Sequence, residues 1–186
     1  PIVETQEGDI TGLVQSNLVS ITDGQIYLSA SLFNEGFRPA IDLGLSVSRI
    51  GSKVQCEAIK KVSRSLKREF AQYKELAALT TIRTKLSADI ELRLKRGQAL
   101  KDFLIQDKSR PLCVEEMIVL FYAFNKELPE VLEDAQRANF KQHIYDYLVK
   151  NHPELIEELT IQKFLTGGVE RGLDKAFEEF FAGSGS

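Results

Sequence analysis

Three residues in the first fifty have side chains suited to work on a phosphate or a carbonyl group: Ser20, Asp23 and Arg49. A hydroxyl or a carboxylate can position a polar ligand, and a guanidinium offers a planar fork of donors to oxyanions. A Ser-His-Asp triad is not indicated, because His143 and His152 both lie far from these groups in the sequence. We therefore interpret the two histidines as structural or surface residues.

Several other kinds of site are disfavoured by the sequence. The pattern Gly-x-x-x-x-Gly-Lys-Ser/Thr is absent, so the chain has no evident phosphate-binding loop of its own. Cys56 and Cys113 lack the Cys-x-x-Cys spacing, so we expect reduced thiols and no metal site. The net charge of -3 disfavours nucleic acid as a partner, because counterion release requires a concentrated basic surface. No apolar run approaches the roughly 20 residues that cross a bilayer, so no direct membrane insertion is expected.

The segment that ends in Arg49 has the alternating pattern of a strand. Its apolar side chains, at every second position from Ile41 to Val47, predict one face on a core and another face toward a ligand or partner. A second short strand is expected over residues 18–21, followed by a turn at Asp23-Gly24 and extended residues 25–28. Arg49 would then stand at the end of a strand.

Beyond Gly51 the apolar residues recur every three or four positions, which predicts helices. Gly97 is expected to end one helix, Pro111 stands near the start of another, and Pro153 separates two more. The predicted helices cover residues 59–76, 86–96, 114–125, 132–148 and 169–180.

This order predicts an α/β part followed by an all-α part. The expected domains are residues 1–76, ending in a connecting helix, and residues 77–182, a helical domain. Residues 183–186 have the composition of a flexible tail or linker. Pro1, followed at once by strand-like residues, indicates that the sequence begins within a domain.

Two stretches resemble the alpha subunits of F-type ATP synthases. They are SNLVSITDGQI at residues 16–26 and RPAIDLGLSVSRIG at residues 38–51. Residues 1–6 and 69–73 are also similar to that family, and weaker similarity continues to residue 116. The catalytic beta subunits have an Asp-Ser-Thr-Ser-Arg type of sequence where this chain has residues 45–49. The resemblance implies the C-terminal strands of a RecA-like P-loop nucleotide-binding domain, followed by a helical bundle domain.

The resemblance also implies roles for the residues introduced above. Arg49 matches the arginine finger that alpha lends in trans to the catalytic site on the adjacent beta subunit. Ser20 matches a residue in the same phosphate region, and Asp23 lies in the same segment as a positioning residue. The isolated chain is expected to catalyse nothing.

A second site is implied for the adenine of a non-catalytic nucleotide, at Phe33, Arg38, Pro39 and Gln106. Lys108 departs from the family, which tends to have a second glutamine there, and this puts adenine selectivity or occupancy in question. ATP or ADP with Mg²⁺ is the cofactor implied for the full complex, whose P-loop lies outside this sequence.

The resemblance implies four partners: the beta subunit, the central rotor shaft (gamma), a peripheral stalk subunit of the delta or OSCP type, and the remainder of alpha. The complex would be peripheral on an energy-transducing membrane, namely the matrix side of the mitochondrial inner membrane, the stromal side of the thylakoid or the cytoplasmic side of a bacterial plasma membrane. It would couple ATP synthesis to proton or sodium transport. Residues 80–86 depart from the family pattern near the expected rotor. Two interpretations stay open for them: a solvated loop, or coupling that uses different charge pairs.

Two alternatives remain open from the sequence. One is a diverged, alpha-like structural or interaction module without a catalytic contribution. The other is a hexameric helicase or export ATPase related by fold, against which the string around Arg49 argues.

Overall fold

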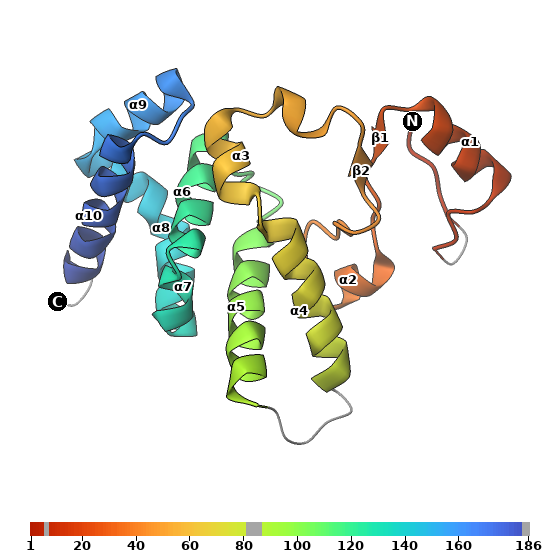
Figure 1. Ribbon diagram of the computed structural model, residues 1–186, viewed down its shortest axis with the longest axis horizontal. Coiled ribbons are helices and arrows are strands. Elements are labelled where there is room, and N and C mark those ends of the chain that lie inside the picture. The colour runs from red at the N-terminus through yellow and green to blue at the C-terminus, as the bar shows by residue number, and fades with distance from the viewer. Residues whose placement is uncertain (6–7, 81–86, 184–186) are drawn as a thin grey trace. The chain divides into compact units, whose positions relative to one another are not determined.

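The computed structural model describes residues 1–5, 8–80 and 87–183 of the chain (Figure 1). The chain divides into two compact units. The N-terminal unit comprises residues 1–55 and 105–110, and the helical unit comprises residues 56–104 and 111–186. The atypical segment 81–86 and residues 184–186 of the expected tail lie outside the described residues. Gly183, which was assigned to that tail, is instead the last residue of a helix.

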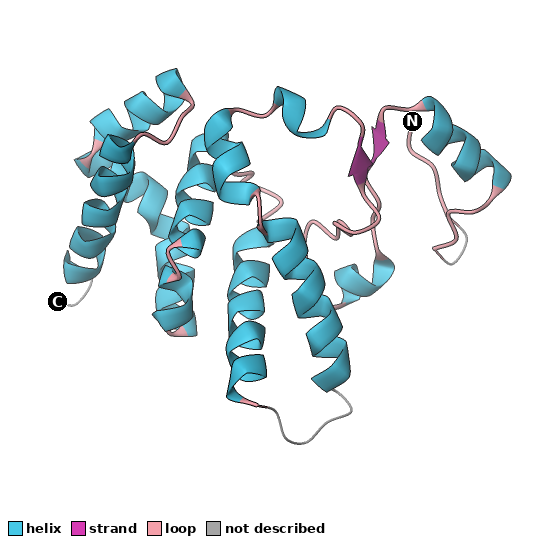
Figure 2. Cartoon of the chain, in the orientation of Figure 1, coloured by secondary structure: helices cyan, strands magenta, loops and turns pink. Residues whose placement is uncertain are grey.

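The N-terminal unit contains short elements joined by turns (Figure 2). Strands β1 (Gly24–Gln25) and β2 (Val47–Ser48) pair antiparallel, with Gly24 opposite Ser48. An isolated bridge joins Leu28 to Ile41. The other elements of this unit are α1 (Leu13–Ile21), α2 (Ala30–Asn34) and the 3-10 helix η1 (Gly51–Val54).

The strand predicted at residues 18–21 is wrong, because these residues form the end of α1. The apolar residues Val14, Leu18 and Ile21 follow a helical period that the four-residue stretch alone does not reveal. The hydroxyls of Ser20 and Thr22 each donate to a carbonyl four residues earlier, at 2.9 and 2.8 Å, and these bonds follow the helical turn.

The strand predicted from Ile41 to Val47 is also largely wrong. Only Val47 belongs to a strand, while Ile41 makes an isolated bridge. Between them, the carboxylate of Asp42 accepts hydrogen bonds from the backbone N–H groups of Gly44 and Leu45, at 2.8 and 3.1 Å. This local side-chain acceptor competes with sheet pairing and bends the chain into a turn.

The helical unit starts with a helix pair that was predicted as one helix over residues 59–76. The structure has α3 (Glu57–Ser63) and α4 (Leu66–Thr80) instead. Near the break, the hydroxyl of Ser63 donates to the carbonyl of Ile59 at 2.7 Å, and the Asn125 amide donates to the carbonyl of Val62 at 2.8 Å. Side-chain donors of this kind take up helical carbonyls and favour a bend.

Helices α4 and α5 (Ala88–Leu104) lie side by side (Figure 1). The expected end of a helix at Gly97 is wrong, since α5 continues for seven more residues, to Leu104. A Cβ on Gly97 would lie 2.2 Å from Cδ2 of Tyr73 in α4. Gly97 therefore does not end a helix. It lets α4 and α5 approach closely, because it has no Cβ.

The helix predicted over residues 114–125 is confirmed as α6 (Val114–Asn125). The Cys113 thiol caps it by accepting from the N–H of Glu116 at 3.4 Å. Pro153 was expected to separate two helices, and it occupies the first position of α9. The remaining helices are α7 (Leu128–Val131), α8 (Asp134–Asn151), α9 (Pro153–Gln162) and α10 (Gly167–Gly183).

The core of the helical unit is formed around α6 and a cluster of phenylalanines. Val119, Leu120 and Ala123 of α6 have no exposed surface. Phe140 of α8 is fully buried and stacks on Phe103 of α5, with ring centroids 6.3 Å apart. Its other aromatic neighbours come from α10: Phe177, Phe180 and Phe181. These contacts bury the apolar stripes of α5, α6, α8 and α10 together.

Polar contacts tie α3 to the rest of the helical unit. Lys163, which follows α9, adopts the left-handed conformation with φ at 53°, and its carbonyl accepts from the N–H of Ala58 at 3.0 Å. Lys61 pairs with Glu170 of α10 at 2.5 Å. The first turn of α3 thus gains an acceptor for one of its otherwise unsatisfied N–H groups.

Candidate functional site

Arg49 directly follows β2 and lies beside the two residues with which it was predicted to act. Its backbone N–H donates to the carbonyl of Asp23 at 2.7 Å. Its guanidinium Nη2 donates to the carbonyl of Ser20 at 3.3 Å. The structure therefore brings Arg49, Ser20 and Asp23 together, although residues 23 and 49 are far apart in sequence.

The anchoring uses main-chain groups, so the side chains of Ser20 and Asp23 do not hold Arg49. The Ser20 hydroxyl donates instead to the carbonyl of Ser16, and the Asp23 side chain is exposed. Across residues 1–5, 8–80 and 87–183, no carboxylate forms an ion pair with the exposed Arg49 side chain. Its charge remains available to an anion, and only one of its donors is used by Ser20.

A second cluster in the N-terminal unit contains the four residues expected near adenine. The guanidinium carbon of Arg38 lies 4.6 Å from the ring centroid of Phe33, which is 53% exposed. Pro39 follows Arg38 through a cis peptide bond. The N–H of Gln106 donates to the carbonyl of Arg38 at 2.7 Å, so the segment 105–110 joins this cluster.

This second cluster has the chemistry of a platform for a flat heterocycle. An exposed ring face and a stacked guanidinium both favour stacking contacts, and the partly exposed Gln106 adds an amide that can donate and accept. The carboxylate of Asp107 accepts from the Ser109 hydroxyl and from its N–H, and these bonds hold the pKa of Asp107 below its usual value. Lys108 lies exposed in this turn.

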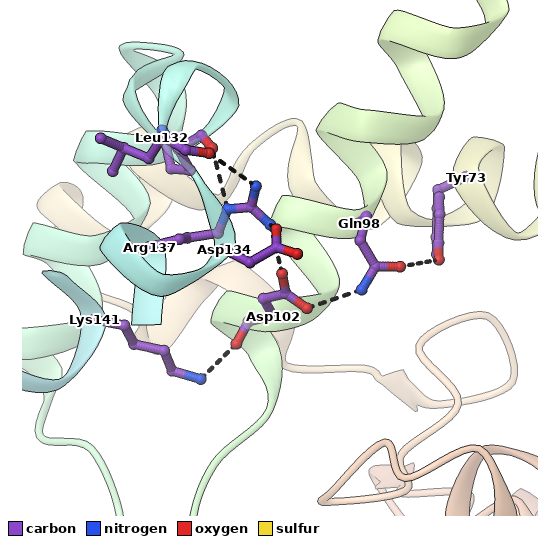
Figure 3. Close-up of polar contacts among 8 residues, drawn as sticks. Tyr73, Gln98, Asp102, Leu132, Asp134, Arg137 and Lys141 are labelled. Carbon is purple, nitrogen blue, oxygen red and sulfur yellow. Dashed lines mark hydrogen bonds and ion pairs between the residues drawn. The ribbon is translucent and has the colours of Figure 1, made fainter. Parts of the chain in front are cut away.

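A third group of polar residues, in the helical unit, was not predicted. Arg137 of α8 is only 4% exposed and pairs with Asp102 of α5 at 2.7 Å (Figure 3). The sequence does contain a signal for it, because Arg137 falls in the same helical stripe as Phe140, Ile144 and Leu148. A cation on an apolar stripe indicates a buried charge that needs partners.

The described part of the chain shows neither a metal-binding cluster nor a membrane-spanning helix. No group of three or more His, Cys, Asp or Glu residues there could hold a metal ion. None of the described helices combines the length and apolar character that a membrane span requires.

Comparison with known families gives two matches along the chain. Residues 55–180 match the family described as "ATP synthase alpha/beta chain, C terminal domain". Residues 1–48 match the "ATP synthase alpha/beta family, nucleotide-binding domain". The chain belongs to the ATP synthase alpha/beta family. The predicted fold class is therefore confirmed: the end of a nucleotide-binding domain precedes a helical C-terminal domain.

Similar curated proteins identify the type of subunit within this ATP synthase family. The chain is 38% identical over 180 residues to "ATP synthase subunit alpha" of Desulfotalea psychrophila (strain LSv54 / DSM 12343). It is 41% identical over 180 residues to the protein of the same name from Helicobacter acinonychis (strain Sheeba). Each match covers 97% of this chain and 36% of the relative. The resemblance to the C-terminal part of an ATP synthase alpha subunit is confirmed, and the chain spans about a third of the length of these relatives.

Proposed function

We propose that this chain works as the C-terminal part of a non-catalytic, regulatory alpha subunit and lends Arg49 to a catalytic site on a neighbouring beta subunit. The observation that carries this proposal is the main-chain anchoring of an exposed arginine. Arg49 is bound at the Ser20 and Asp23 carbonyls, and no carboxylate among the described residues pairs with its guanidinium. An arginine held in this way is positioned without being neutralised.

The physical role of Arg49 follows from the charge that develops during phosphoryl transfer. Negative charge spreads over the phosphate oxygens in the transition state, and a positioned guanidinium stabilises that charge in a site from which water is excluded. The planar fork of arginine contacts two oxygens at once, which the ammonium of lysine cannot reproduce. In this role the Ser20 segment forms the support of the arginine, beside the phosphate region.

We propose a second role for Phe33, Arg38, Pro39 and Gln106 as contacts to the adenine of a non-catalytic nucleotide. The stacked pair of Arg38 and Phe33 and the bond between Gln106 and Arg38 support it. ATP or ADP with Mg²⁺ would bind in the full complex, with the phosphates and the metal held by a P-loop outside this chain. The residues present fit the base and supply no phosphate cradle.

The proposed assembly follows from the same subunit type. The partners are the beta subunit, the gamma shaft, a peripheral stalk subunit of the delta or OSCP type and the remainder of alpha. The complex would be peripheral on an energy-transducing membrane and would couple ATP synthesis to the transport of protons or sodium ions. The helical unit would lie around the shaft and transmit its rotation.

Substitution of Arg49 in the assembled head tests the catalytic proposal. We expect Arg49→Ala to lower steady-state ATP turnover by about 10³-fold while nucleotide still binds to the beta sites, because the arginine acts on the transition state. Arg49→Lys should recover only a small part of the loss. Lys53→Ala removes a nearby exposed cation from η1 and should leave turnover unchanged. Near-normal turnover of Arg49→Ala would instead favour a structural or interaction module.

A further inference from the structure

Asp42 accepts hydrogen bonds from three backbone N–H groups in the residues that follow it. Its carboxylate accepts from the N–H groups of Gly44 and Leu45, at 2.8 and 3.1 Å. Its carbonyl accepts from the N–H of Ser46 at 3.0 Å. A single residue therefore closes the turn over residues 42–46, with acceptors in both its side chain and its main chain.

The same turn is bound to an earlier segment of the N-terminal unit. The N–H of Asp42 donates to the carbonyl of Tyr27 at 2.9 Å, and the N–H of Tyr27 donates to the hydroxyl of Ser46 at 3.0 Å. The side-chain amide of Gln25 donates to the carbonyl of Leu45 at 3.1 Å. Both ends of the turn are thus fixed to β1 or to the chain just beyond it.

The end of this turn leads directly into the candidate site. Ser46 ends the turn, β2 follows with only two residues, and Arg49 comes next. The N–H of Arg49 donates to the carbonyl of Asp23 at 2.7 Å, so the direction of the guanidinium depends on the register of β2 against β1. A shift by one residue would turn this side chain to the opposite face, because side chains alternate along a strand.

Strand β2 has few contacts of its own that could fix its register. It pairs with β1 over two residues, and both residues of β2 are exposed. A two-stranded ribbon is at best marginally stable in water, and a strand without a buried face specifies its register weakly. Within the N-terminal unit, the register of β2 therefore depends on the turn that precedes it.

We propose that Asp42 is a positioning residue for Arg49: its carboxylate fixes the turn over residues 42–46 and thereby sets the direction in which the guanidinium leaves the end of β2. In this role the carboxylate acts as a hydrogen-bond acceptor, so its charge is not required. This inference rests on the arginine-finger role proposed above for Arg49.

The test measures ATP hydrolysis by the assembled ATP synthase head whose alpha subunit contains this chain. We expect Asp42→Ala to lower kcat by about 10- to 100-fold with an unchanged KM for ATP, because a displaced guanidinium stabilises the transition state less without affecting substrate binding. Asp42→Asn keeps an oxygen acceptor at the same place and should retain kcat within about twofold of the unmodified head. Equal losses in the two variants would show that the charge matters rather than the turn, and would overturn the proposal.

Gln25→Ala is a milder perturbation of the same turn. It removes the hydrogen bond to the Leu45 carbonyl while Asp42 keeps its own contacts. We expect a loss of kcat of about three- to tenfold with KM unchanged, which corresponds to one neutral hydrogen bond. Should Asp42→Ala fail to assemble, an unchanged kcat in Gln25→Ala would by itself overturn the proposal.

Asp9→Ala is the matched control. The carboxylate of Asp9 accepts from the N–H and the hydroxyl of Thr11, at 2.8 and 2.7 Å, in a second local contact of the same unit. This contact precedes α1 and does not lead into β2. The variant removes a carboxylate that accepts two hydrogen bonds, as Asp42→Ala does, and should leave kcat unchanged. A loss of kcat of equal size in Asp9→Ala would refute the specific role of the turn before Arg49.

Arg49→Ala separates failure of this inference from failure of the arginine-finger proposal. If Arg49→Ala lowers turnover and Asp42→Ala does not, the positioning role is refuted while the finger stands. If Arg49→Ala leaves turnover near normal, the finger is refuted and the positioning role with it. Adding Asp42→Ala to Arg49→Ala should cause no further loss of kcat, since both changes remove the same interaction. A further loss as large as that of Asp42→Ala alone would show that Asp42 acts elsewhere and would overturn the positioning role.

Discussion

Gly97→Ala sets two effects on stability against each other: the higher helix propensity of alanine and the steric overlap of its Cβ with Tyr73. In an isolated helix the change is favourable by about 1 kcal/mol, because alanine loses less backbone entropy on folding than glycine. In α5 the new Cβ would lie 2.2 Å from Cδ2 of Tyr73 and 2.4 Å from both Cβ and Cγ of that residue. Real Cβ atoms do not approach so closely, so α4 and α5 would have to separate.

The cost of this separation decides whether Gly97→Ala raises or lowers the free energy of unfolding. Overpacking by one methyl group costs about 1–3 kcal/mol, and the upper end applies here because one of the contacts is to the Cβ of Tyr73, which no rotamer change can move away. Subtracting the propensity gain of about 1 kcal/mol leaves a net loss of about 2 kcal/mol in the free energy of unfolding. The Tyr73 hydroxyl would also be displaced from Gln98, with which it bonds at 2.8 Å.

Chemical denaturation followed by circular dichroism measures this free energy for the 186-residue chain. A graded series at Tyr73 provides the internal control. In the Tyr73→Ala background the contact to Cβ remains and Gly97→Ala should cost less, whereas in the Tyr73→Gly background it should become stabilising by about 1 kcal/mol. Stabilisation by Gly97→Ala in the unmodified chain would refute the close approach of α4 and α5.

Two more predictions concern stability. Lys163→Gly should raise the free energy of unfolding by about 1 kcal/mol in a urea titration, because glycine adopts the left-handed conformation at φ 53° without the steric cost; Lys163→Ala should give no such gain. Burial and the hydrogen bond from Tyr122 to Asp174 raise the pKa of the Tyr122 phenol to about 12, so its contribution is complete below the usual value of 10.0 and is lost as pH rises toward 12. Tyr122→Phe should therefore show a smaller loss of stability over this pH interval in thermal melts, and an unchanged slope would contradict the assignment.

The sequence predicts the helical unit well where periodicity and end signals agree. The helix over residues 114–125 shows both features, and its bounds are those of α6. The prediction fails at Gly97, because a glycine that ends a helix and one that admits a neighbouring helix look alike in sequence. Only the position of Tyr73 on α4 distinguishes the two.

The N-terminal unit is harder to predict because local hydrogen bonds to side chains determine its backbone conformation. The alternation before Arg49 is typical of a strand, yet the Asp42 carboxylate bends the segment by accepting two backbone N–H groups. Ser20, Asp23 and Arg49 were indicated by their side-chain chemistry, whereas their roles and the four adenine residues came from the resemblance to a family. Their mutual geometry was not predictable, since it depends on carbonyl groups that every residue has.

The way Arg49 is anchored also bears on how much this part of the chain tolerates mutation. Because positions 20 and 23 contribute carbonyl oxygens, most substitutions there change a side chain without removing the acceptor. Alanine substitutions at these two positions would leave Arg49 in place. They would report only the roles of the Ser20 and Asp23 side chains. The placement of the arginine is therefore robust to mutation at its supports, and it is lost mainly through changes that redirect the backbone.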